Sequence, residues 1–297
     1  MHAAATTECI FDLSRYSLSD VTIISVCYRS DDEIGRMVST VPLEVPIVLV
    51  DNGGTNDFTQ LPDNRSVKIV PLIENEGFGK GCNAGAKLAN TPFLFFLNPD
   101  TRLKEGAIEA LLEAAESYPD GAAFNPRIVN RDGGAYFKRR SYLLPRSASM
   151  KRGWPDKDCK VPILSGAALF VSKANFETVQ GFDPNIFLYH EDDDLSLRLQ
   201  KLGSLFYVRN SLVEHASGHS TARSPEVAYF KAFHMAQSRI YIGLKYCRPA
   251  PILTTLLAGV MLLLSPHSFF SPRRRAKAFG LIKGTREMSR ELRGRGL

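Results

Sequence analysis

Three runs of almost uninterrupted apolar residues occur in the first third of the chain. They are VTIISVCY (21–28), VPIVLV (45–50) and FLFFLN (93–98), and each ends in a polar or glycine-rich segment. Runs of this length without clean alternation are typical of strands that are buried on both faces of a parallel sheet. The pattern therefore predicts three parallel strands.

Stretches with helical periodicity separate or follow these strands, at residues 31–39, 81–89 and 105–117. Strand alternating with helix over about 100 residues predicts an α/β fold with a mostly parallel, Rossmann-like sheet flanked by helices. In such sheets ligands bind at the carboxyl ends of the strands, so the polar residues that follow each strand are candidates for function.

The rest of the chain is less regular. Residues 125–162 are rich in Arg, Lys, Gly and Pro, which indicates loops and short strands over the cleft, and residues 166–182 indicate a strand followed by a helix. A helix is expected over 225–245, and an apolar segment follows at 250–264. Fifteen helical residues extend ~22 Å, less than the ~30 Å of a bilayer core, so we expect this segment to be buried or interfacial.

Composition narrows the class of protein. The chain has 297 residues, 44% of them hydrophobic, which is enough for one large core with an appendage. Its five cysteines are an odd number with no C-x-x-C spacing, which favours a reducing cytoplasm over a disulfide framework. The N-terminus lacks the basic and apolar regions of a signal peptide.

The net charge of +6 is concentrated at the C-terminal end. From Ser271 onward nine Lys and Arg face two Glu, a net +7, which leaves −1 for the rest of the chain. A nucleic-acid enzyme would carry its positive charge around the working cleft, so this distribution argues against that class.

An acidic run, Glu191 to Asp194, lies between an aromatic segment and an amphipathic helix in FLYHEDDDLSLRL. Acids at a helix start complement the helix dipole, but one or two would suffice. Because neighbouring carboxylates disfavour each other's ionisation, a four-acid run indicates a catalytic base, a metal site or both.

Polar residues follow two of the predicted strands. Asp51 and Asn52 begin DNGGTND, where a carboxylate is placed to accept a hydrogen bond from a bound base, although a hairpin or Asx turn explains the same residues. Asn98 and Asp100 lie in LNPDT, where their oxygens suit Mg²⁺ or Mn²⁺, the alternative being a turn that caps the next helix.

Two further segments contain candidate residues. ENEGFGKGCNAG has closely spaced glycines and Asn83, and it matches neither the dinucleotide fingerprint nor the P-loop, so a flexible turn remains an alternative. VEHASGHS contains His215 and His219, which we expect on a loop because Gly218 and serines separate them.

Taken together and in this order, the segments resemble the family 2 glycosyltransferases of GT-A fold, and within them the rhamnosyltransferase-like branch. The matching segments are VTIISVCYRS, IVLVDNGGTND, ENEGFGKGCNAG, FLFFLNPDT, LSGAALFVSKANFETVQGFD, FLYHEDDDLSLRLQKLG and VEHASGHST. They cover residues 21–246, about three quarters of the chain.

The resemblance implies roles for individual residues. Asp192 matches the catalytic base, Glu191 and Gly166 would contact the acceptor, and Asp100 with His215 would hold a divalent cation, Mg²⁺ or Mn²⁺. Asp51 matches the residue that reads the base. The residues implied at the nucleotide sugar are Tyr28, Asp51, Asn52, Gly77, Phe78, Gly79, Asn83, Asn98 and Asp100.

The sequence departs from the family pattern at two positions. Asn98 stands where the D-x-D motif has its first aspartate, as is usual in this branch, which weakens the case for tight metal binding. Asp193 places an extra charge beside Asp192, so the choice of Asp192 as base depends on the pattern alone. Asp194 is expected mainly to cap the helix.

The implied function is an inverting transfer of a sugar from a nucleotide-diphosphate donor to a glycan or lipid-linked acceptor, in cell-surface polysaccharide synthesis. The resemblance to the rhamnosyltransferase-like branch favours dTDP-rhamnose as the donor, with a UDP-sugar as the alternative. A sugar-nucleotide pyrophosphorylase and a noncatalytic glycan-binding module are the rival interpretations. The sequence lacks the basic, glycine-rich segment that a pyrophosphorylase would need near its N-terminus. A noncatalytic module would not need the acidic run.

The chain divides into a lead-in (1–20), a GT-A domain (21–246) and an apolar and basic helical tail (247–297). The tail combines a segment too short to span a bilayer with a strong positive charge, which predicts peripheral attachment to an anionic membrane at its cytoplasmic face. The alternative is a tail that packs on the domain.

Overall fold

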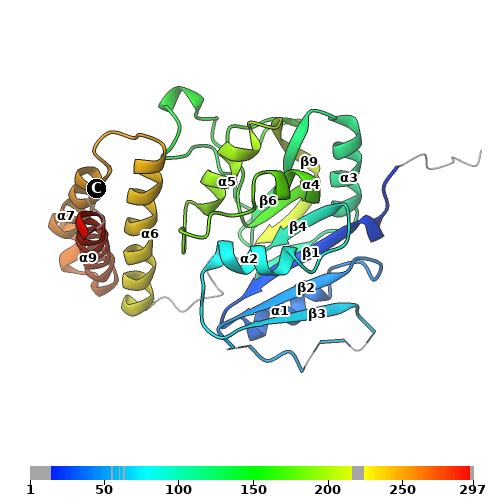
Figure 1. Ribbon diagram of the computed structural model, residues 1–297, viewed down its shortest axis with the longest axis horizontal. Helices are drawn as coiled ribbons and strands as arrows, with labels where there is room; N and C mark the ends of the chain where they lie inside the picture. The colour runs from blue at the N-terminus through cyan, green and yellow to red at the C-terminus, as the bar shows by residue number, and fades with distance from the viewer. Residues whose placement is uncertain (1–14, 55, 60, 63, 216–223, 295–297) are drawn as a thin grey trace, which may run out of the picture.

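The computed structural model describes residues 15–294 apart from 55, 60, 63 and 216–223. Helices cover both faces of a central sheet, and a layer of long helices stands beside this sheet domain (Figure 1). The lead-in is described from Arg15, and within it Tyr16 packs its ring against Phe93 at 4.7 Å, before the short helix η1 (Leu18–Asp20).

The first half of the sheet is parallel. It consists of β1 (Val21–Cys27), β2 (Ile47–Asn52), β3 (Val67–Leu72) and β4 (Phe93–Leu97), in the order β3-β2-β1-β4. Every residue of β1, β2 and β4 is buried, which confirms the three strands predicted from apolar runs. The edge strand β3 alternates between exposed and partly buried residues, and a prediction based on continuous apolar runs did not find it.

Beyond β4 the sheet is mixed. β8 (Ala168–Ser172) is antiparallel to β4 and to β6 (Gly121–Asn130), whereas β6 is parallel to β9 (Ser204–His215). The short strands β5 (Thr101–Leu103) and β7 (Cys159–Lys160) both run antiparallel to β9. Residues 131–158 form loops that include the short helix η2 (Arg146–Ala148).

Alternate side chains of the buried strands supply two cores. On one face Ile23 packs with α1 (Asp31–Val38) and α3 (Ala107–Ser117). On the other face Ile24 packs with α2 (Phe78–Ala86), α4 (Lys173–Thr178) and α5 (Glu191–Leu199). This division follows from the two-residue period of a strand.

Helix α2 begins three residues before its predicted start because its glycines are packing residues. A Cβ at Gly81 would lie 2.8 Å from Val26, and one at Gly85 would lie 2.6 Å from Ile24. The absence of side chains therefore lets α2 lie directly on β1. A flexible turn does not describe this segment.

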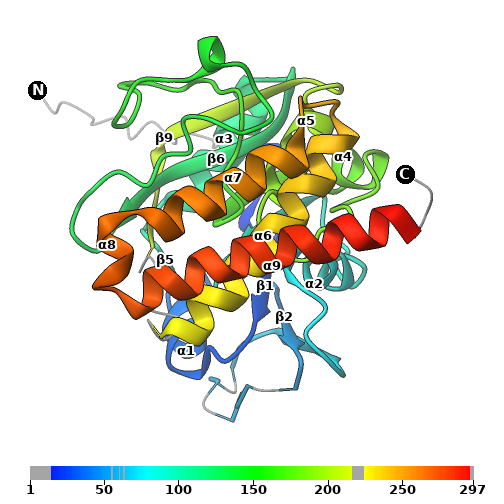
Figure 2. The same cartoon turned by 90° about the vertical axis from the view of Figure 1, so that its left-hand side faces the viewer.

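The helical layer comprises α6 (Pro225–Lys245), α7 (Pro251–Leu264), α8 (Pro266–Phe269) and α9 (Pro272–Gly294). Figure 2 shows α7 and α9 crossing in front of α6, which lies between them and the sheet domain. Gly280 and Gly284 let α9 approach α6 closely, since a Cβ at either would come within 2.4 Å of the α6 backbone. Among the described residues, no helix combines the length and apolarity that a membrane span requires.

Candidate active site

The predicted donor-side residues meet at the carboxyl ends of neighbouring strands. Asp51 and Asn52 end β2, Tyr28 follows β1, and Asp100 follows β4 by three residues. Because β2, β1 and β4 are adjacent and parallel, these side chains share one edge of the sheet. The fold thus brings these residues together, and their role at a donor site stays a prediction.

A network of amide side chains holds Asp51 and Asn52 in place. Asn56 Nδ2 donates to Asp51 Oδ1 at 2.6 Å and to the carbonyl of Cys27 at 3.0 Å. Asn52 accepts from the backbone N–H of Glu76 at 2.9 Å and donates to the Gly77 carbonyl at 3.3 Å. The turn after β2 is thus bonded to the start of α2, and the hairpin alternative is excluded because β2 pairs in parallel with β3.

The glycine-rich segment contributes less to a ligand site than the resemblance implied. The Asn83 amide is fully engaged with Phe182, donating to its carbonyl at 2.8 Å and accepting from its N–H at 2.9 Å. A Cβ on Gly79 would meet Phe182 at 3.0 Å, and one on Gly77 would overlap the Phe187 carbonyl. These three residues pack α2 against the segment before the acidic run, so we assign Asn83 a structural role.

Asp100 and His215 come together although 115 positions separate them in the chain. His215 Nε2 lies 3.2 Å from Asp100 Oδ1, and both side chains are buried. His215 is the last residue of β9 and pairs with Thr101 of β5, so it lies on a strand rather than on the predicted loop. His219 lies outside the described residues.

The four acids open α5 and have four different environments. Asp192 accepts from the backbone N–H of Gly166 at 3.0 Å and from that of Asp193 at 2.9 Å, and it faces the Lys138 ammonium at 2.6 Å. Gly166 allows this approach because it has no Cβ, and the site for one lies 3.3 Å from the Asp192 Cβ. The Asp192 side chain is 17% exposed, against 4% for Asp193.

Asp193 is less exposed than Asp192, and both of its carboxylate oxygens face neighbouring side chains. His190 Nδ1 lies 2.8 Å from Asp193 Oδ2, and Lys138 Nζ lies 2.9 Å from Oδ1. Burial alone would raise the pKa of Asp193, but the hydrogen bond with His190 and the charge of Lys138 lower it overall. The carboxylates of Asp192 and Asp193 raise the pKa of Lys138 against the effect of its own burial, so this lysine is charged.

Glu191 behaves as a neutral acid at neutral pH. Burial, and then the charge of Asp192, raise its pKa to about 8. Its Oε2 is buried and has no hydrogen-bond partner within the part of the chain that the structure describes. A protonated carboxyl group with an unused oxygen is suited to hydrogen bonding with a hydroxyl-bearing ligand.

The prediction that Asp194 mainly caps α5 is wrong. Asp194 is fully buried and joins α5 to the end of α6 through the Tyr246 hydroxyl at 2.8 Å and Lys245 Nζ at 2.6 Å. Arg198 Nε, on α5 itself, also donates to it at 2.8 Å. The N-cap residue is His190, and the acid that accepts from an N–H of the first turn is Asp192, from Asp193. The four carboxylates therefore differ in their contacts: Asp192 and Asp193 share Lys138, Asp194 binds groups of α5 and α6, and Glu191 Oε2 has no partner among the described residues.

The backbone before the acids adopts an uncommon conformation. Tyr189 and His190 have φ angles of 68° and 67°, in the left-handed region that residues with a Cβ seldom occupy. Two successive residues of this kind cost on the order of 1–3 kcal/mol each and persist where the surroundings hold them. They turn the chain so that Glu191 and Asp192 face the same cavity.

That cavity has a volume of about 1180 Å³ and lies between the sheet domain and α6. Five of the predicted residues line it, namely Phe78, Asn98, Gly166, Glu191 and Asp192. Tyr136 also lines it and connects it with the Asp100 pair, because the ring centroids of Tyr136 and His215 are 4.7 Å apart. Partial burial, the charge of Asp192 and, more weakly, that of Asp100 raise the pKa of Tyr136.

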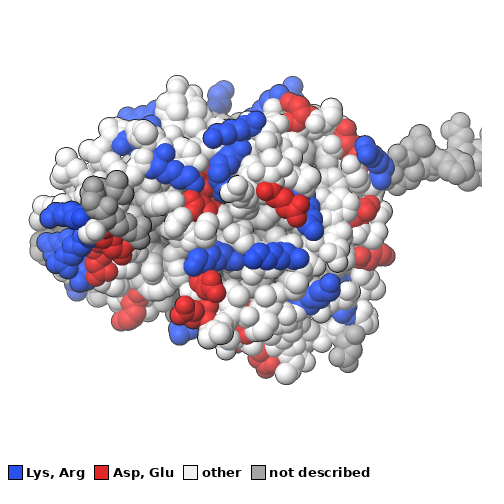
Figure 3. All heavy atoms as spheres, viewed as in Figure 1, with Lys and Arg blue, Asp and Glu red and all other residues white. Residues whose placement is uncertain are grey.

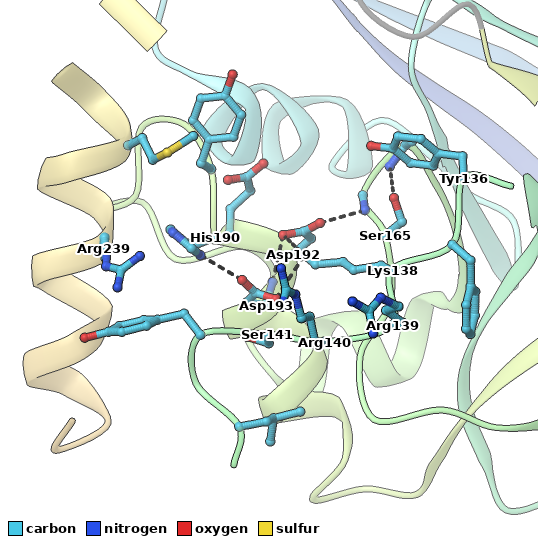
Figure 4. Close-up of a pocket in the computed structure, with 18 of the residues that line it drawn as sticks. Tyr136, Lys138, Arg139, Arg140, Ser141, Ser165, His190, Asp192, Asp193 and Arg239 are labelled. Carbon is cyan, nitrogen blue, oxygen red and sulfur yellow. Dashed lines mark hydrogen bonds and ion pairs between the residues drawn. The ribbon is translucent and has the colours of Figure 1, made fainter. Parts of the chain in front are cut away.

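Several cavity residues were missed by the sequence analysis. Figure 4 shows Lys138, Arg139 and Arg140 reaching in from one wall and Arg239 from helix α6. The run KRR at 138–140 was a signal, since it lies in the segment predicted to cover the cleft. Arg239 gave no such signal, because it is an isolated arginine in a long helix.

Comparison with known protein families identifies the family of this chain. The family model "Glycosyl transferase family 2" matches residues 22–179, which include β1, β4, Asp51 and Asp100. The chain belongs to glycosyl transferase family 2. Membership removes the pyrophosphorylase alternative, and the protein is a glycosyltransferase.

One curated relative covers nearly all of the chain. It is the N-acetylglucosaminyl-diphospho-decaprenol L-rhamnosyltransferase of Mycobacterium tuberculosis, which is 30% identical over 85% of this chain and 95% of its own length. The branch suggested by the motifs is therefore confirmed as rhamnosyltransferase-like.

Solved structures support the fold. S. aureus TarS 1-349 superposes with a TM-score of 0.53 at 14% identity, covering 91% of both chains. A structure titled GalNAc-T7 with UDP, GalNAc and Mn²⁺ gives a TM-score of 0.53 at 17% identity, covering 76% of this chain and 52% of that one. At these identities the likeness shows the fold alone.

Proposed function

We propose that this glycosyltransferase transfers a sugar from a nucleotide diphosphate to a lipid-linked sugar during synthesis of a cell-envelope glycan. Rhamnose is the sugar that we favour. The observation that carries the proposal is that Asp192 and Tyr136 line one cavity, and that the Tyr136 ring packs against His215, the partner of Asp100. The activity named for the mycobacterial relative supports rhamnose as the sugar and a diphosphate-linked acceptor.

The donor would lie along the carboxyl edge of β1, β2 and β4. Asp51, oriented by Asn56, would accept from the nucleobase, and Tyr28 and Asn98 would flank the nucleotide sugar. Asp100 and His215 would bind a divalent cation, and their carboxylate oxygen and imidazole nitrogen fit Mn²⁺. Such a cation neutralises charge on the departing diphosphate.

A cation bound by Asp100 and His215 alone would have further coordination positions for phosphate and water. Within the described part of the chain, no cluster of three or more His, Cys, Asp or Glu is placed to hold a metal by itself. This agrees with a cation that binds together with the donor, as Mg²⁺ does at phosphate sites. The Mn²⁺ in the GalNAc-T7 structure supports the same choice.

Asp192 would act as the base of an inverting displacement. The acceptor hydroxyl attacks the anomeric carbon, its proton passes to Asp192, and the bond to the nucleotide diphosphate breaks with inversion. Gly166 N–H, Asp193 N–H and Lys138 occupy three of the four lone-pair positions of the Asp192 carboxylate. One position on Oδ2 remains for the hydroxyl.

Glu191 would bind the acceptor rather than take its proton. Its raised pKa keeps it protonated at neutral pH, and its unpartnered Oε2 is available to a sugar hydroxyl. The acceptor sugar would thus be held between Glu191 and Asp192.

The helical layer supports peripheral attachment to an anionic bilayer. Helix α7 turns its small residues Thr255 and Gly259 inward and exposes Leu253, Leu257, Met261 and Leu264 along one side. Phe269 and Phe270, which are 73% and 90% exposed, extend this apolar surface around α8. We call this surface the α7–α8 face.

Charge complementarity supports an anionic bilayer as the occupant of the α7–α8 face. Arg273, Arg274 and Lys277 are exposed on the first turns of α9, immediately after Phe270. Exposed apolar and aromatic residues beside cations are typical of helices that bind the interface of an anionic membrane. Each cation near such a surface contributes about 1 kcal/mol.

A donor screen tests the proposed activity. Melting temperatures in dTDP, UDP and GDP, each with Mn²⁺, should rise most for the cognate nucleotide, by an amount that corresponds to ~2.7 kcal/mol at 100 times Kd. Transfer from the matching nucleotide sugar to an N-acetylglucosaminyl diphosphate lipid should follow. Stabilisation that is equal for all three, or absent, would contradict the donor site.

Vesicle sedimentation tests the membrane proposal. The protein should pellet with anionic vesicles and much less with neutral ones. Loss of binding in Arg273→Gln/Arg274→Gln, with retention in the control Lys87→Gln/Lys201→Gln, two exposed cations of the sheet domain, would support it. Equal pelleting with both vesicles, or a stable dimer formed through the α7–α8 face, would refute it.

A further inference from the structure

The cavity has an excess of cations that the transfer chemistry does not use. Six Lys and Arg line it against three acids, and of these six only Lys138 pairs with Asp192 and Asp193. The other five cations make no ion pair with a carboxylate among the described residues, and they are Arg139, Arg140, Arg146, Arg239 and Arg248. Figure 3 shows the basic side chains gathered around acidic ones between the helical layer and the sheet domain.

Two of these arginines are held together on one aromatic ring. The Arg239 guanidinium lies 4.0 Å from the centroid of the Tyr142 ring, and that of Arg248 lies 5.7 Å from it. The Nε atoms of both arginines are buried and have no hydrogen-bond partner in the part of the chain that is described. Like charges brought together with unused donors form a preorganised anion site.

The site lies at the end of the cavity nearest the helical layer. Arg239 projects from α6, across the cavity from Arg139 and Arg140, with His190 and Asp193 between them (Figure 4). Arg248 is in the link between α6 and α7, three residues before α7 begins. The anion site is therefore next to the start of the helix that forms the α7–α8 face.

We propose that Arg239 and Arg248, stacked on Tyr142, bind the diphosphate that joins the acceptor sugar to its lipid. This inference builds on the proposed function and identifies the acceptor subsite. The sugar would lie beside Glu191 and Asp192, and the lipid would leave the cavity toward α7. Arginine suits this role because its planar fork binds phosphate oxygens in pairs.

A donor nucleotide also carries a diphosphate, so the test must distinguish the diphosphate of the donor from that of the acceptor. Arg239→Gln, Arg248→Gln and the double variant are compared with Arg152→Gln, an exposed arginine in the loops at 131–158 that does not line the cavity. The probes are N-acetylglucosamine joined to a short alkyl chain through a diphosphate, and the same sugar as a plain alkyl glycoside. Binding of each probe is measured by calorimetry without donor, and transfer is measured with donor.

We expect each single variant to bind the diphosphate probe about 10- to 100-fold more weakly, the range for losing a hydrogen bond to a charged group. Affinity for the plain glycoside and for dTDP or UDP should not change, and the KM for the diphosphate acceptor should rise with little change in kcat. Arg152→Gln should behave as the wild type.

Three outcomes would overturn the inference. Unchanged affinity for the diphosphate probe would exclude the site, equal loss for both probes would indicate a structural role, and loss of nucleotide binding would assign the arginines to the donor. Because calorimetry needs no turnover, a wild-type protein that bound the diphosphate probe but transferred nothing would refute only the proposed function.

Discussion

The sheet domain and the helical layer place apolar side chains in opposite ways. In β1, β2 and β4 every residue is buried, and the two cores fill both faces of the sheet. In α7, by contrast, Leu257 and Met261 are 48% and 72% exposed, while Thr255 and Gly259 face the neighbouring helix. Apolar residues thus form a core in one region and an outer surface in the other.

Charged residues show the converse difference. The sheet domain buries Asp100, Asp193 and Asp194, whereas Arg273 and Arg274 of the helical layer are exposed. A buried charge is costly unless specific groups bind it, so its presence marks chemistry or a structural joint. An exposed apolar surface of this extent marks an interface. The comparison therefore separates the region in which we propose the reaction from the region that we propose docks on a membrane.

The same substitution in the two regions should have opposite consequences. Leu49→Asp places a carboxylate in the core of β2 and should unfold the protein, since burial of an unpaired charge costs several kcal/mol of a total stability of ~5–15 kcal/mol. Leu257→Asp should leave the melting temperature nearly unchanged and abolish pelleting with anionic vesicles. Unfolding by both variants would show that α7 belongs to the core.

Within the acidic run, Asp192→Asn should reduce turnover by roughly 10²- to 10⁴-fold, because the amide cannot accept the acceptor proton. Nucleotide binding and the melting temperature should be retained. Asp193→Asn, the matched control, alters a carboxylate that faces His190 and Lys138 and should cost far less turnover. A normal rate for Asp192→Asn with a large loss for Asp193→Asn would reverse the assignment.

Asp194→Asn tests the joint between the two regions. It removes the buried charge that binds Arg198 and Lys245, and a broken buried pair costs about 3–5 kcal/mol. We expect a marked fall in the denaturation midpoint. Asp120→Asn, which disrupts an exposed pair with Lys160, should have little effect, and equal midpoints for the two variants would show that Asp194 is not a joint.

The last prediction concerns Glu191, whose contribution to stability depends on pH. Its pKa of about 8 in the fold lies above the ordinary value of 4.5, so folding favours the protonated form. The stabilisation is complete below pH 4.5, and it is lost as the pH rises to about 8. Relative to Glu191→Gln, the wild type should therefore lose stability between pH 5 and 8 in thermal melts. Parallel pH profiles would show that Glu191 ionises normally.

The sequence predicted those parts of the fold that depend on local pattern. The buried strands, the helix at 225–245 and the apolar helix near 250–264 all appear where expected, because period and composition are local properties. The edge strand β3 was missed because half of it faces solvent. The antiparallel pairing of β4 with β8 joins residues more than 70 positions apart, which no local pattern specifies.

The same distinction applies to the candidate site. Motifs gave Asp51, Asp100 and Asp192, whose neighbours along the chain form recognisable segments. They did not give Lys138 or Arg239, which reach the cavity from separate elements, nor the role of Asp194, whose partners lie on α6. The contact of Asp100 with His215 depends on the pairing of β5 with β9 and is a property of the folded chain.

Acceptor-dependent release of the nucleoside diphosphate tests the central claim most directly. The wild type, given dTDP-rhamnose or the UDP-sugar chosen by the donor screen, should release the nucleoside diphosphate only when an N-acetylglucosaminyl diphosphate lipid is present. The lipid product should gain the mass of one sugar residue, and Asp192→Asn should suppress both signals together. Release that is independent of the acceptor, or a lipid of unchanged mass, would contradict the account.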